Sequence, residues 1–289
     1  MKEREYNMYD IIIIGAGPAG ISASLYARRA NLNVLVFYSG ESELEKAEKI
    51  DNYYGFPDGI TGKKLFEQGI EQAKKIGVEI IKNEVIKISK SSSSFIIKTI
   101  ESEHEAKAII LSTGNKKIKP NIEGIEEFEG KGVSYCAICD AFFYRNKNVA
   151  VIGNGDFAVS EAGELSHVAD RVTLLTNGLD EPKCEFEINN KKIKRIIGEK
   201  RVKGIEFEDG TSLDVDGIFI ALGQASAGDF AKTLGIIQNG ENIKVNDKME
   251  TNIEGIYACG NVTGNLLQVC KAVHEGAEAA LSAINYVRK

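Results

Sequence analysis

The stretch Gly15-Ala16-Gly17-Pro18-Ala19-Gly20 decides the fold of this chain. It fits the pattern Gly-x-Gly-x-x-Gly and stands between residues 9–15, which predict a buried strand, and residues 18–30, which predict a helix. In this context the first glycine makes a tight turn, the second lets backbone approach a pyrophosphate, and the third packs the helix closely. The motif predicts a dinucleotide site lined by Gly15, Gly17, Pro18, Ala19 and Gly20.

A carboxylate that binds the ribose is usual after the second strand of such a unit. Residues 33–37 predict that strand, and Tyr38 stands where the acid is often found. Glu41 and Glu43 follow shortly after, so either glutamate is a candidate for this role. We keep Tyr38 as a candidate cofactor-binding residue at this position.

Strand and helix patterns alternate along the chain, which predicts α/β architecture with parallel sheets. A second strand–glycine–helix unit begins near residue 148, residues 185–220 predict short antiparallel strands, and the first pattern returns from residue 242. We therefore predict two Rossmann-like three-layer domains, the second inserted into the first. The outer domain comprises residues 1–116 and 242–289, the insert comprises residues 117–241, and the hinges lie at 114–117 and 223–226.

The bulk composition restricts the classes of function. The net charge of −6 argues against a nucleic-acid partner, because attraction to phosphates needs a basic face. The polar N-terminus lacks the apolar stretch of a signal peptide, and no apolar run approaches the ~20 residues of a membrane helix. We expect a cytoplasmic protein with no membrane partner.

Cys136 and Cys139 have the spacing Cys-x-x-Cys and are followed by Asp140. Two thiols at this spacing can close a small disulfide ring and exchange electrons with a flavin or a protein partner. The other three cysteines and the three histidines are scattered and supply no second ligand pair, so we expect no metal. Because reducing a disulfide needs a proton for the departing thiolate, Asp140 is the candidate general acid.

The chain carries, in this order, the motifs Gly15–Gly20, Asp51–Pro57, Ser112–Gly114, Cys136–Asp140, Ala258–Asn261 and Gly276–Ala280. Their order resembles that of the low-molecular-weight thioredoxin reductases. The resemblance covers nearly the whole chain, and the Cys-x-x-Cys-Asp motif inside the insert is its most specific part.

The resemblance implies a homodimeric FAD enzyme whose insert rotates between two positions. Cys139 would face the flavin, and Cys136 would attack the disulfide of thioredoxin. The outer domain would hold FAD, with the backbone of Val85 at the adenine. The other implied FAD contacts are Gly15, Gly17, Gly20, Asn52, Thr113, Gly114, Gly260, Asn261, Gln268 and Val269.

Some residues of the insert depart from the family pattern, and these differences bear on the electron donor. The second motif, residues 153–158, keeps the glycines for NADPH but places Phe157 where the family has a small hydroxyl residue. The family's next strand runs into arginines that hold the 2′-phosphate, whereas residues 176–181 here read Thr-Asn-Gly-Leu-Asp-Glu. This pattern resembles the ferredoxin-dependent flavin thioredoxin reductases, in which ferredoxin reduces the flavin directly.

Two alternatives stay open. NADH lacks the 2′-phosphate, so an NAD(P)H-dependent thioredoxin reductase with altered nucleotide recognition also fits residues 153–158. A flavin-based redox sensor without turnover is the other, although the intact Cys136, Cys139 and Asp140 argue against it. Near the flavin, residues 40–49 replace the family's Gly-Gly-Gln loop, and Asn261 replaces an aspartate that usually binds the ribityl chain.

Two further features of the insert need an explanation. Seven basic residues crowd positions 191–203, either as a solvated face or as a docking surface for an acidic ferredoxin. Phe142, Phe143 and Tyr144 follow the dithiol, and we expect all three in the core.

Overall fold

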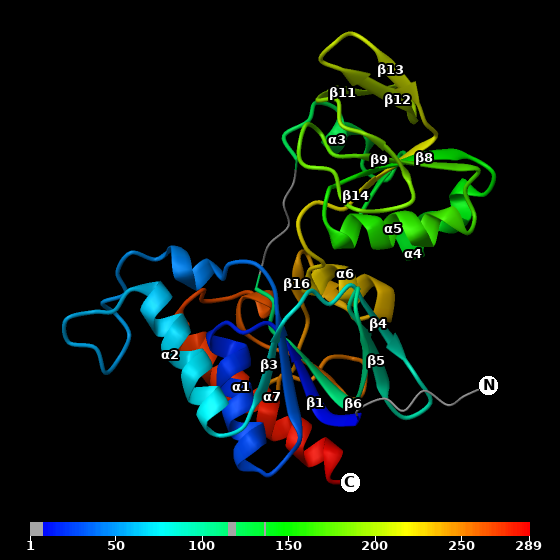
Figure 1. Ribbon diagram of the computed structural model, residues 1–289. Coiled ribbons are helices and arrows are strands. Elements are labelled where there is room, and N and C mark those ends of the chain that lie inside the picture. Colours follow the sequence, from blue (N-terminus) through cyan, green and yellow to red (C-terminus); the bar gives the residue numbers. More distant parts are fainter. Residues whose placement is uncertain (1–7, 115–119, 136) are drawn as a thin grey trace. The chain divides into compact units, whose positions relative to one another are not determined.

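The computed structural model describes residues 8–114, 120–135 and 137–289. The chain forms two compact units: unit 1 comprises residues 1–116 and 226–289, and unit 2 comprises residues 117–225. Each unit has a sheet with helices packed on it, mixed in unit 1 and parallel in unit 2 (Figure 1). The predicted fold class, two Rossmann-like α/β units with the second inserted into the first, is confirmed.

Unit 1 is built on a seven-stranded sheet with the order β3-β2-β1-β6-β5-β4. Strands β3, β2, β1 and β6 are parallel, whereas β5 and β4 are antiparallel. The long β6 pairs with β5 along its first half and with β17 along its second half. The bounds are β1 Met8–Ile14, β2 Val34–Tyr38, β3 Glu79–Lys82, β4 Lys87–Lys90, β5 Phe95–Lys98, β6 Glu103–Leu111 and β17 Ile256–Ala258.

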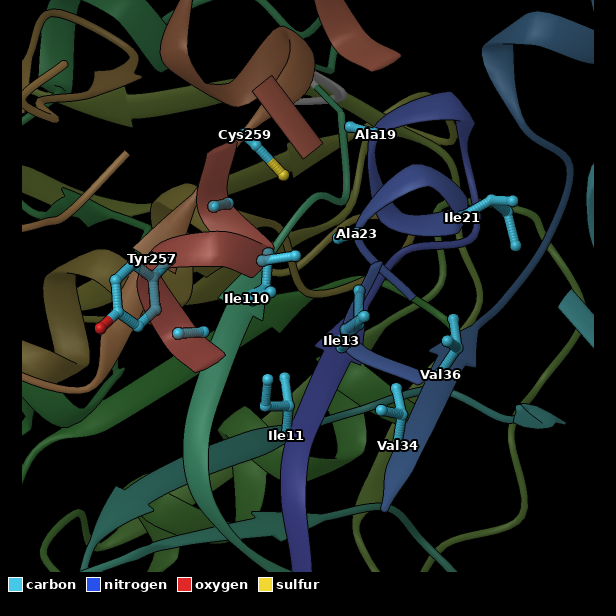
Figure 2. Packing of buried hydrophobic residues seen from close by; sticks show 14 of the residues in the cluster. Ile11, Ile13, Ala19, Ile21, Ala23, Val34, Val36, Ile110, Tyr257 and Cys259 are labelled. Atoms are coloured by element: carbon cyan, nitrogen blue, oxygen red, sulfur yellow. The ribbon is translucent and has the colours of Figure 1, made fainter. Parts of the chain in front are cut away.

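Helices α1 (Pro18–Arg29) and α7 (Val269–Val287) lie side by side on one face of this sheet (Figure 1). Ser22 Oγ donates to the carbonyl oxygen of Val273 at 2.6 Å, and the Arg288 guanidinium donates to that of Ala30 at 2.8 Å. These contacts join corresponding positions, so the two helices run in the same direction. Figure 2 shows the buried core between helix and sheet, with Ala19 and Cys259 at one end of it.

The remaining elements of unit 1 are short, apart from one amphipathic helix. Helix α2 begins after Thr61, whose side chain accepts from the backbone N–H of Lys64. No helix in the described parts of the chain is long and apolar enough to cross a membrane. The bounds are η1 Glu43–Lys46, α2 Gly62–Lys75, α6 Ala227–Leu234, β15 Gln238–Asn239, β16 Asn242–Ile243 and η3 Gly260–Thr263.

Unit 2 contains a five-stranded parallel sheet, β10-β9-β8-β14-β7, and a three-stranded antiparallel sheet, β11-β12-β13. Its strands are β7 Val133–Ser134, β8 Asn148–Ile152, β9 Arg171–Leu175, β10 Glu187–Asn189, β11 Ile193–Gly198, β12 Val202–Phe207, β13 Ser212–Asp214 and β14 Gly217–Ile220. Its helices are α3 Ile125–Phe128, α4 Ala137–Asp140, η2 Ala141–Tyr144 and α5 Asp156–Ser166.

The antiparallel pattern predicted for residues 185–220 holds only for β11, β12 and β13. Strands β10 and β14 instead join the parallel sheet, next to β9 and β8. Both are short, and four or fewer residues carry too little periodicity to distinguish the two kinds of pairing.

Residues 226–241 lie in unit 1, although the sequence analysis assigned them to the insert. Ser226 and Asp229 form a capping box at the start of α6, and the backbone N–H of Ala227 donates to Thr113 Oγ1 at 3.0 Å. These bonds tie α6 to the end of β6. The boundary at 225/226 falls within the predicted hinge 223–226, and of the other predicted hinge, residues 115–117 lie outside the described residues.

The expectation that Phe142 and Phe143 lie in the core is wrong. Their exposed fractions are 74% and 64%, whereas Tyr144 is 6% exposed and packs against Phe219 with ring centroids 5.2 Å apart. The three residues belong to η2, a 3₁₀ helix with three residues per turn. One residue per turn therefore faces the core, and the two phenylalanines face outward.

We expect Gly276→Ala to destabilise unit 1 by about 1–3 kcal/mol, because overpacking a tight contact has costs of this size. A Cβ at Gly276 would lie 2.1 Å from the carbonyl oxygen of Ala19. The control is Gly69→Ala in α2, where the added Cβ meets Ile21 Cγ2 at 3.4 Å, an ordinary contact. That variant should gain up to about 1 kcal/mol from helix propensity. Urea unfolding of both apoproteins measures the difference, and equal shifts would contradict the close packing.

Candidate functional site

The glycine turn between β1 and α1 is packed tightly at two of its three glycines. Gly15 has φ +111°, and a Cβ on it would lie 2.3 Å from the carbonyl oxygen of Ser112. A Cβ on Gly20 would lie 1.9 Å from the carbonyl oxygen of Gly15. For a Cβ on Gly17, the nearest atom among the described residues is Ser42 Oγ, at 4.0 Å. Of the three glycines, Gly17 alone has room beside its backbone among the described residues, as the approach of a ligand requires.

The N-terminus of α1 fits a pyrophosphate. Gly17 is the N-cap residue and Pro18 the first helical residue, while Ala19 is 4% exposed. In the described part of the chain, no side chain caps this end of the helix. The free N–H groups and the helix dipole together favour an anion there. These residues fit the pyrophosphate of a dinucleotide such as FAD.

Two predicted cofactor-binding residues that are 216 positions apart are hydrogen-bonded to each other. Asn52 Nδ2 donates to Gln268 Oε1 at 3.0 Å. Gln268 is the N-cap residue of α7, and Val269, its first helical residue, is partly exposed. The amide pair joins the loop after η1 to the start of α7.

The three candidates for the ribose-binding position, Tyr38, Glu41 and Glu43, have different surroundings. Tyr38 ends β2, and its ring packs against Phe66 at a centroid distance of 5.9 Å. Glu41 is exposed, and Glu43 forms an ion pair with Lys46 at 2.9 Å. The sequence analysis did not consider Ser42, whose hydroxyl oxygen is the nearest described atom to a Cβ built on Gly17, at 4.0 Å. Its side chain also accepts from the Leu44 N–H and thereby caps η1, so η1 fixes its position.

The other predicted FAD contacts lie in loops of unit 1. Val85 is 4% exposed and follows β3. Thr113 and Gly114 follow β6, and Gly114 has φ +76°. Gly260 (φ +80°) and Asn261 lie in η3, directly after β17.

One of the three cysteines outside the predicted dithiol is buried beside this loop. Cys259 has an exposed fraction of 0%, and burial raises the pKa of its thiol, with the Glu275 carboxylate adding to the shift. A thiol held neutral in this way is a poor nucleophile. The structure thus agrees with a packing role for Cys259.

Of the predicted dithiol, Cys136 lies outside the described residues, and Cys139 is the third residue of α4. Asp140 ends this helix, and its Oδ2 accepts from Ser134 Oγ at 2.6 Å. At the other end, the backbone N–H of Ala137 donates to Glu161 Oε2 at 2.7 Å. Carboxylates therefore hold both ends of the short helix. Glu161 comes from α5, 24 positions later, and no sequence pattern pointed to it.

Several residues of the segment after β9 are buried or form hydrogen bonds within unit 2. Thr176 is 1% exposed, and Asn177 Oδ1 accepts from the backbone N–H of Ile193 at 2.7 Å. Asn154, in the second glycine motif, donates through Nδ2 to the carbonyl oxygen of Asp180 at 3.3 Å. This hydrogen bond thus links the second glycine turn to the residues after β9. In other Rossmann-like domains, the ribose of a dinucleotide is bound between these two segments.

The basic residues at positions 191–203 are partly neutralised on their own small sheet. Lys191 pairs with Asp209 at 2.8 Å, and Lys194 and Arg195 both pair with Glu206 at 2.6 Å. Exposed pairs of this kind add little stability, but they reduce the positive potential that would attract an acidic partner. This arrangement favours a solvated face.

Comparison with known proteins places this geometry in a family. Residues 9–182 and 185–276 match the family described as pyridine nucleotide-disulphide oxidoreductase. The thioredoxin reductases of Bacillus subtilis and Aquifex aeolicus are 34% and 35% identical, over 99% and 97% of this chain and 96% and 94% of their own lengths.

Two solved structures are similar to this chain over nearly its whole length. The atypical thioredoxin reductase TRi from Desulfovibrio vulgaris Hildenborough is 39% identical with a TM-score of 0.92, covering 97% of this chain and 98% of that one. A ferredoxin-flavin thioredoxin reductase from Clostridium acetobutylicum is 38% identical with a TM-score of 0.73, covering 96% of this chain and 97% of that one.

We expect Gly17→Ala to weaken FAD binding without weakening the fold. The backbone of Gly17 has φ −66°, which alanine adopts freely, and the added Cβ meets nothing closer than 4.0 Å in the described chain. It would occupy the space that a pyrophosphate needs, so FAD affinity should fall at least about tenfold, or about 1.4 kcal/mol. Titration of the apoprotein with FAD and thermal unfolding measure the two properties.

Gly20→Ala is the matched control for this prediction. Its Cβ would strike the Gly15 carbonyl at 1.9 Å, so this variant should lose stability even without FAD. Wild-type FAD affinity in Gly17→Ala would rule out the site at the start of α1.

Proposed function

The chain belongs to the pyridine nucleotide-disulphide oxidoreductase family, and we propose that it is a thioredoxin reductase whose electron donor is reduced ferredoxin. FAD is the cofactor of the thioredoxin reductases of this family. The proposal includes the domain roles: residues 1–116 and 226–289 bind FAD, and the insert carries the Cys136–Cys139 dithiol. It also includes a homodimer and a cytoplasmic location, where the reducing environment keeps dithiols in use.

The residues around the glycine turn are suited to hold FAD. The free N–H groups at the start of α1 would bind the pyrophosphate, and the Asn52–Gln268 pair would border the flavin portion. Asn261 would hydrogen-bond the ribityl chain through its amide. Bound FAD, once two one-electron transfers from reduced ferredoxin have reduced it, would supply the two electrons that open the Cys136–Cys139 disulfide.

The dithiol then passes both electrons to thioredoxin. The Cys136 thiolate attacks one sulfur of the thioredoxin disulfide, which forms a mixed disulfide and releases the other thioredoxin sulfur as a thiolate. Cys139 attacks the Cys136 sulfur of this mixed disulfide, releases the second thioredoxin thiolate and re-forms the Cys136–Cys139 disulfide. Asp140 follows Cys139 in the chain, and its carboxyl group accepts from the Ser134 hydroxyl at 2.6 Å; in this proposal it would deliver a proton to a departing thiolate.

The bond from Asn154 to the carbonyl oxygen of Asp180 is the observation that carries the choice of ferredoxin. It occupies the region between the second glycine turn and the end of β9, and the exposed side chains there include those of Asp180 and Glu181. Asp156 adds a third carboxylate in the first turn of α5, where a pyrophosphate would otherwise bind. Carboxylates repel phosphates, so a nicotinamide dinucleotide would meet an acidic region in which Asn154 is already hydrogen-bonded.

A specific observation favours the NAD(P)H-dependent alternative. The stem of Lys192 lies against Gly178, where a Cβ would come within 3.0 Å of Lys192 Cγ. This lysine brings a positive charge to the turn after β9, where NADP-binding domains usually place an arginine. In this alternative Lys192 replaces that arginine.

Anaerobic stopped-flow measurements distinguish the two donors. We expect reduced ferredoxin to bleach the flavin absorbance within seconds, and millimolar NADH or NADPH to leave it oxidised over the same time. Dithionite serves as the control that the flavin is reducible. Rapid bleaching by NADPH that is lost in Lys192→Glu would replace ferredoxin with NADPH as the donor.

Two substitutions test the assigned chemistry. Cys136→Ser should abolish thioredoxin reduction while its flavin is still reduced by the donor. In Asp140→Asn the amide oxygen still accepts from Ser134, so geometry is kept while the proton donor is lost, and the rate should fall about 100-fold or more. Ser134→Ala is the control that removes the hydrogen bond and keeps the carboxyl group. Wild-type turnover by Asp140→Asn would remove Asp140 from the mechanism.

A further inference from the structure

A buried ion pair lies in the first two turns of α7. Lys271 Nζ and Glu275 Oε2 are 3.0 Å apart, and their side chains are 11% and 10% exposed. Taking two charges out of water is costly unless further hydrogen bonds satisfy them. The partners of these further hydrogen bonds therefore indicate the role of the ion pair.

The further bonds of both side chains go to one loop, Gly260–Gly264. Glu275 Oε2 accepts from the backbone N–H of Gly260 at 2.8 Å. Lys271 Nζ donates to the carbonyl oxygens of Gly260 at 2.9 Å and Gly264 at 2.6 Å. Thr263 Oγ1 lies 2.9 Å from each of the two charged groups. Both ends of the loop are thereby fixed to α7.

This loop borders the glycine turn at the start of α1. A Cβ on Gly260 would lie 2.9 Å from Ala19 Cβ, and Ala19 lies in the first turn of α1. Asn261, the predicted ribityl contact, stands between the two fixed ends of the loop. The ion pair therefore sets how far Asn261 stands from the pyrophosphate-binding turn.

The stability of α7 itself does not explain the pair. Lys271 is the third residue of the helix, and a cation near a helix N-terminus opposes the dipole. The order Lys then Glu at positions i and i+4 is also the less favourable orientation for a helix pair. The geometry of the loop, rather than the helix, accounts for these charges.

We propose that Lys271 and Glu275 are positioning residues for FAD, which hold Gly260–Gly264 in the conformation that receives the cofactor. The inference rests on the family's cofactor and on neither the donor nor thioredoxin. The pair carries no net charge, and it positions the loop through its hydrogen bonds.

The test replaces the pair by apolar residues of similar size, Lys271→Met with Glu275→Leu. Such replacements often keep or raise the stability of a protein. The replacement also leaves backbone groups of Gly260 and Gly264 without these partners, which lowers stability. The apoprotein should therefore remain folded, while FAD affinity should fall at least about tenfold, which corresponds to about 1.4 kcal/mol. The absorbance of bound flavin should also shift. Isothermal titration of the apoprotein with FAD and thermal unfolding measure these properties.

A matched control comes from another helix of unit 1. Lys75 and Glu71 form an ion pair at positions i and i+4 of α2, with side chains 72% and 63% exposed. Lys75→Met with Glu71→Leu should leave FAD affinity unchanged. Wild-type FAD affinity in the Lys271/Glu275 double variant would overturn the proposal.

A milder variant keeps the proposal testable if the double variant does not fold. In Glu275→Gln the amide oxygen still accepts from Gly260, but Lys271 loses its countercharge. FAD should then dissociate several times faster than from wild type, and Lys271→Arg, which keeps charge and donors, should lose less. Equal dissociation rates for Glu275→Gln and wild type would overturn the proposal. Wild-type protein that binds no FAD at all would instead disprove the cofactor assignment.

Discussion

The close approach of α1 and α7 is the contact on which unit 1 depends. Gly276 lies so near the carbonyl of Ala19 that a methyl group would not fit between them. Because the helices run in the same direction, their N-termini lie at the same edge of the sheet, where parallel strands end. That edge brings together the free N–H groups of α1, Gln268 at the start of α7 and the loop after β17. In open α/β sheets this carboxyl edge is where ligands bind.

Much of this arrangement can be predicted from the sequence, because glycine is needed where a turn requires positive φ or where two backbone segments approach closely. The positions of Gly15, Gly17 and Gly20 between a strand and a helix indicated a turn, an open backbone and a close packing, and each has that geometry. Very short elements were less readable. Strands β10 and β14 pair in parallel where antiparallel pairing was expected, and η2 turns Phe142 and Phe143 outward. In such elements, tertiary contacts decide orientation.

In the candidate site, too, some residues could be predicted from the sequence and others could not. The family motifs supplied the residue types, and the structure brings Asn52 and Gln268 into contact across 216 positions. The supporting residues were missed: Ser42 near Gly17, Glu161 at the start of α4, and Lys271 with Glu275 under the loop. Each acts through hydrogen bonds or close approaches whose partners only the folded chain brings together. Such contacts leave no periodicity or spacing in a lone sequence, whereas turns and helix starts do.

The two glycine motifs of the chain show why such a motif alone does not establish a nucleotide site. A Cβ on Gly153 would lie 2.1 Å from the carbonyl oxygen of Ala221, so packing alone requires this glycine, with or without a ligand. The difference lies in what surrounds the turn. Among the described residues, a Cβ on Gly17 would meet no atom closer than 4.0 Å, whereas a Cβ on Gly155 would lie 3.3 Å from the carbonyl oxygen of Gly223, and Asn154 is bonded to Asp180. A glycine framework can therefore reflect packing as well as ligand binding, and the residues after the next strand help to distinguish the two.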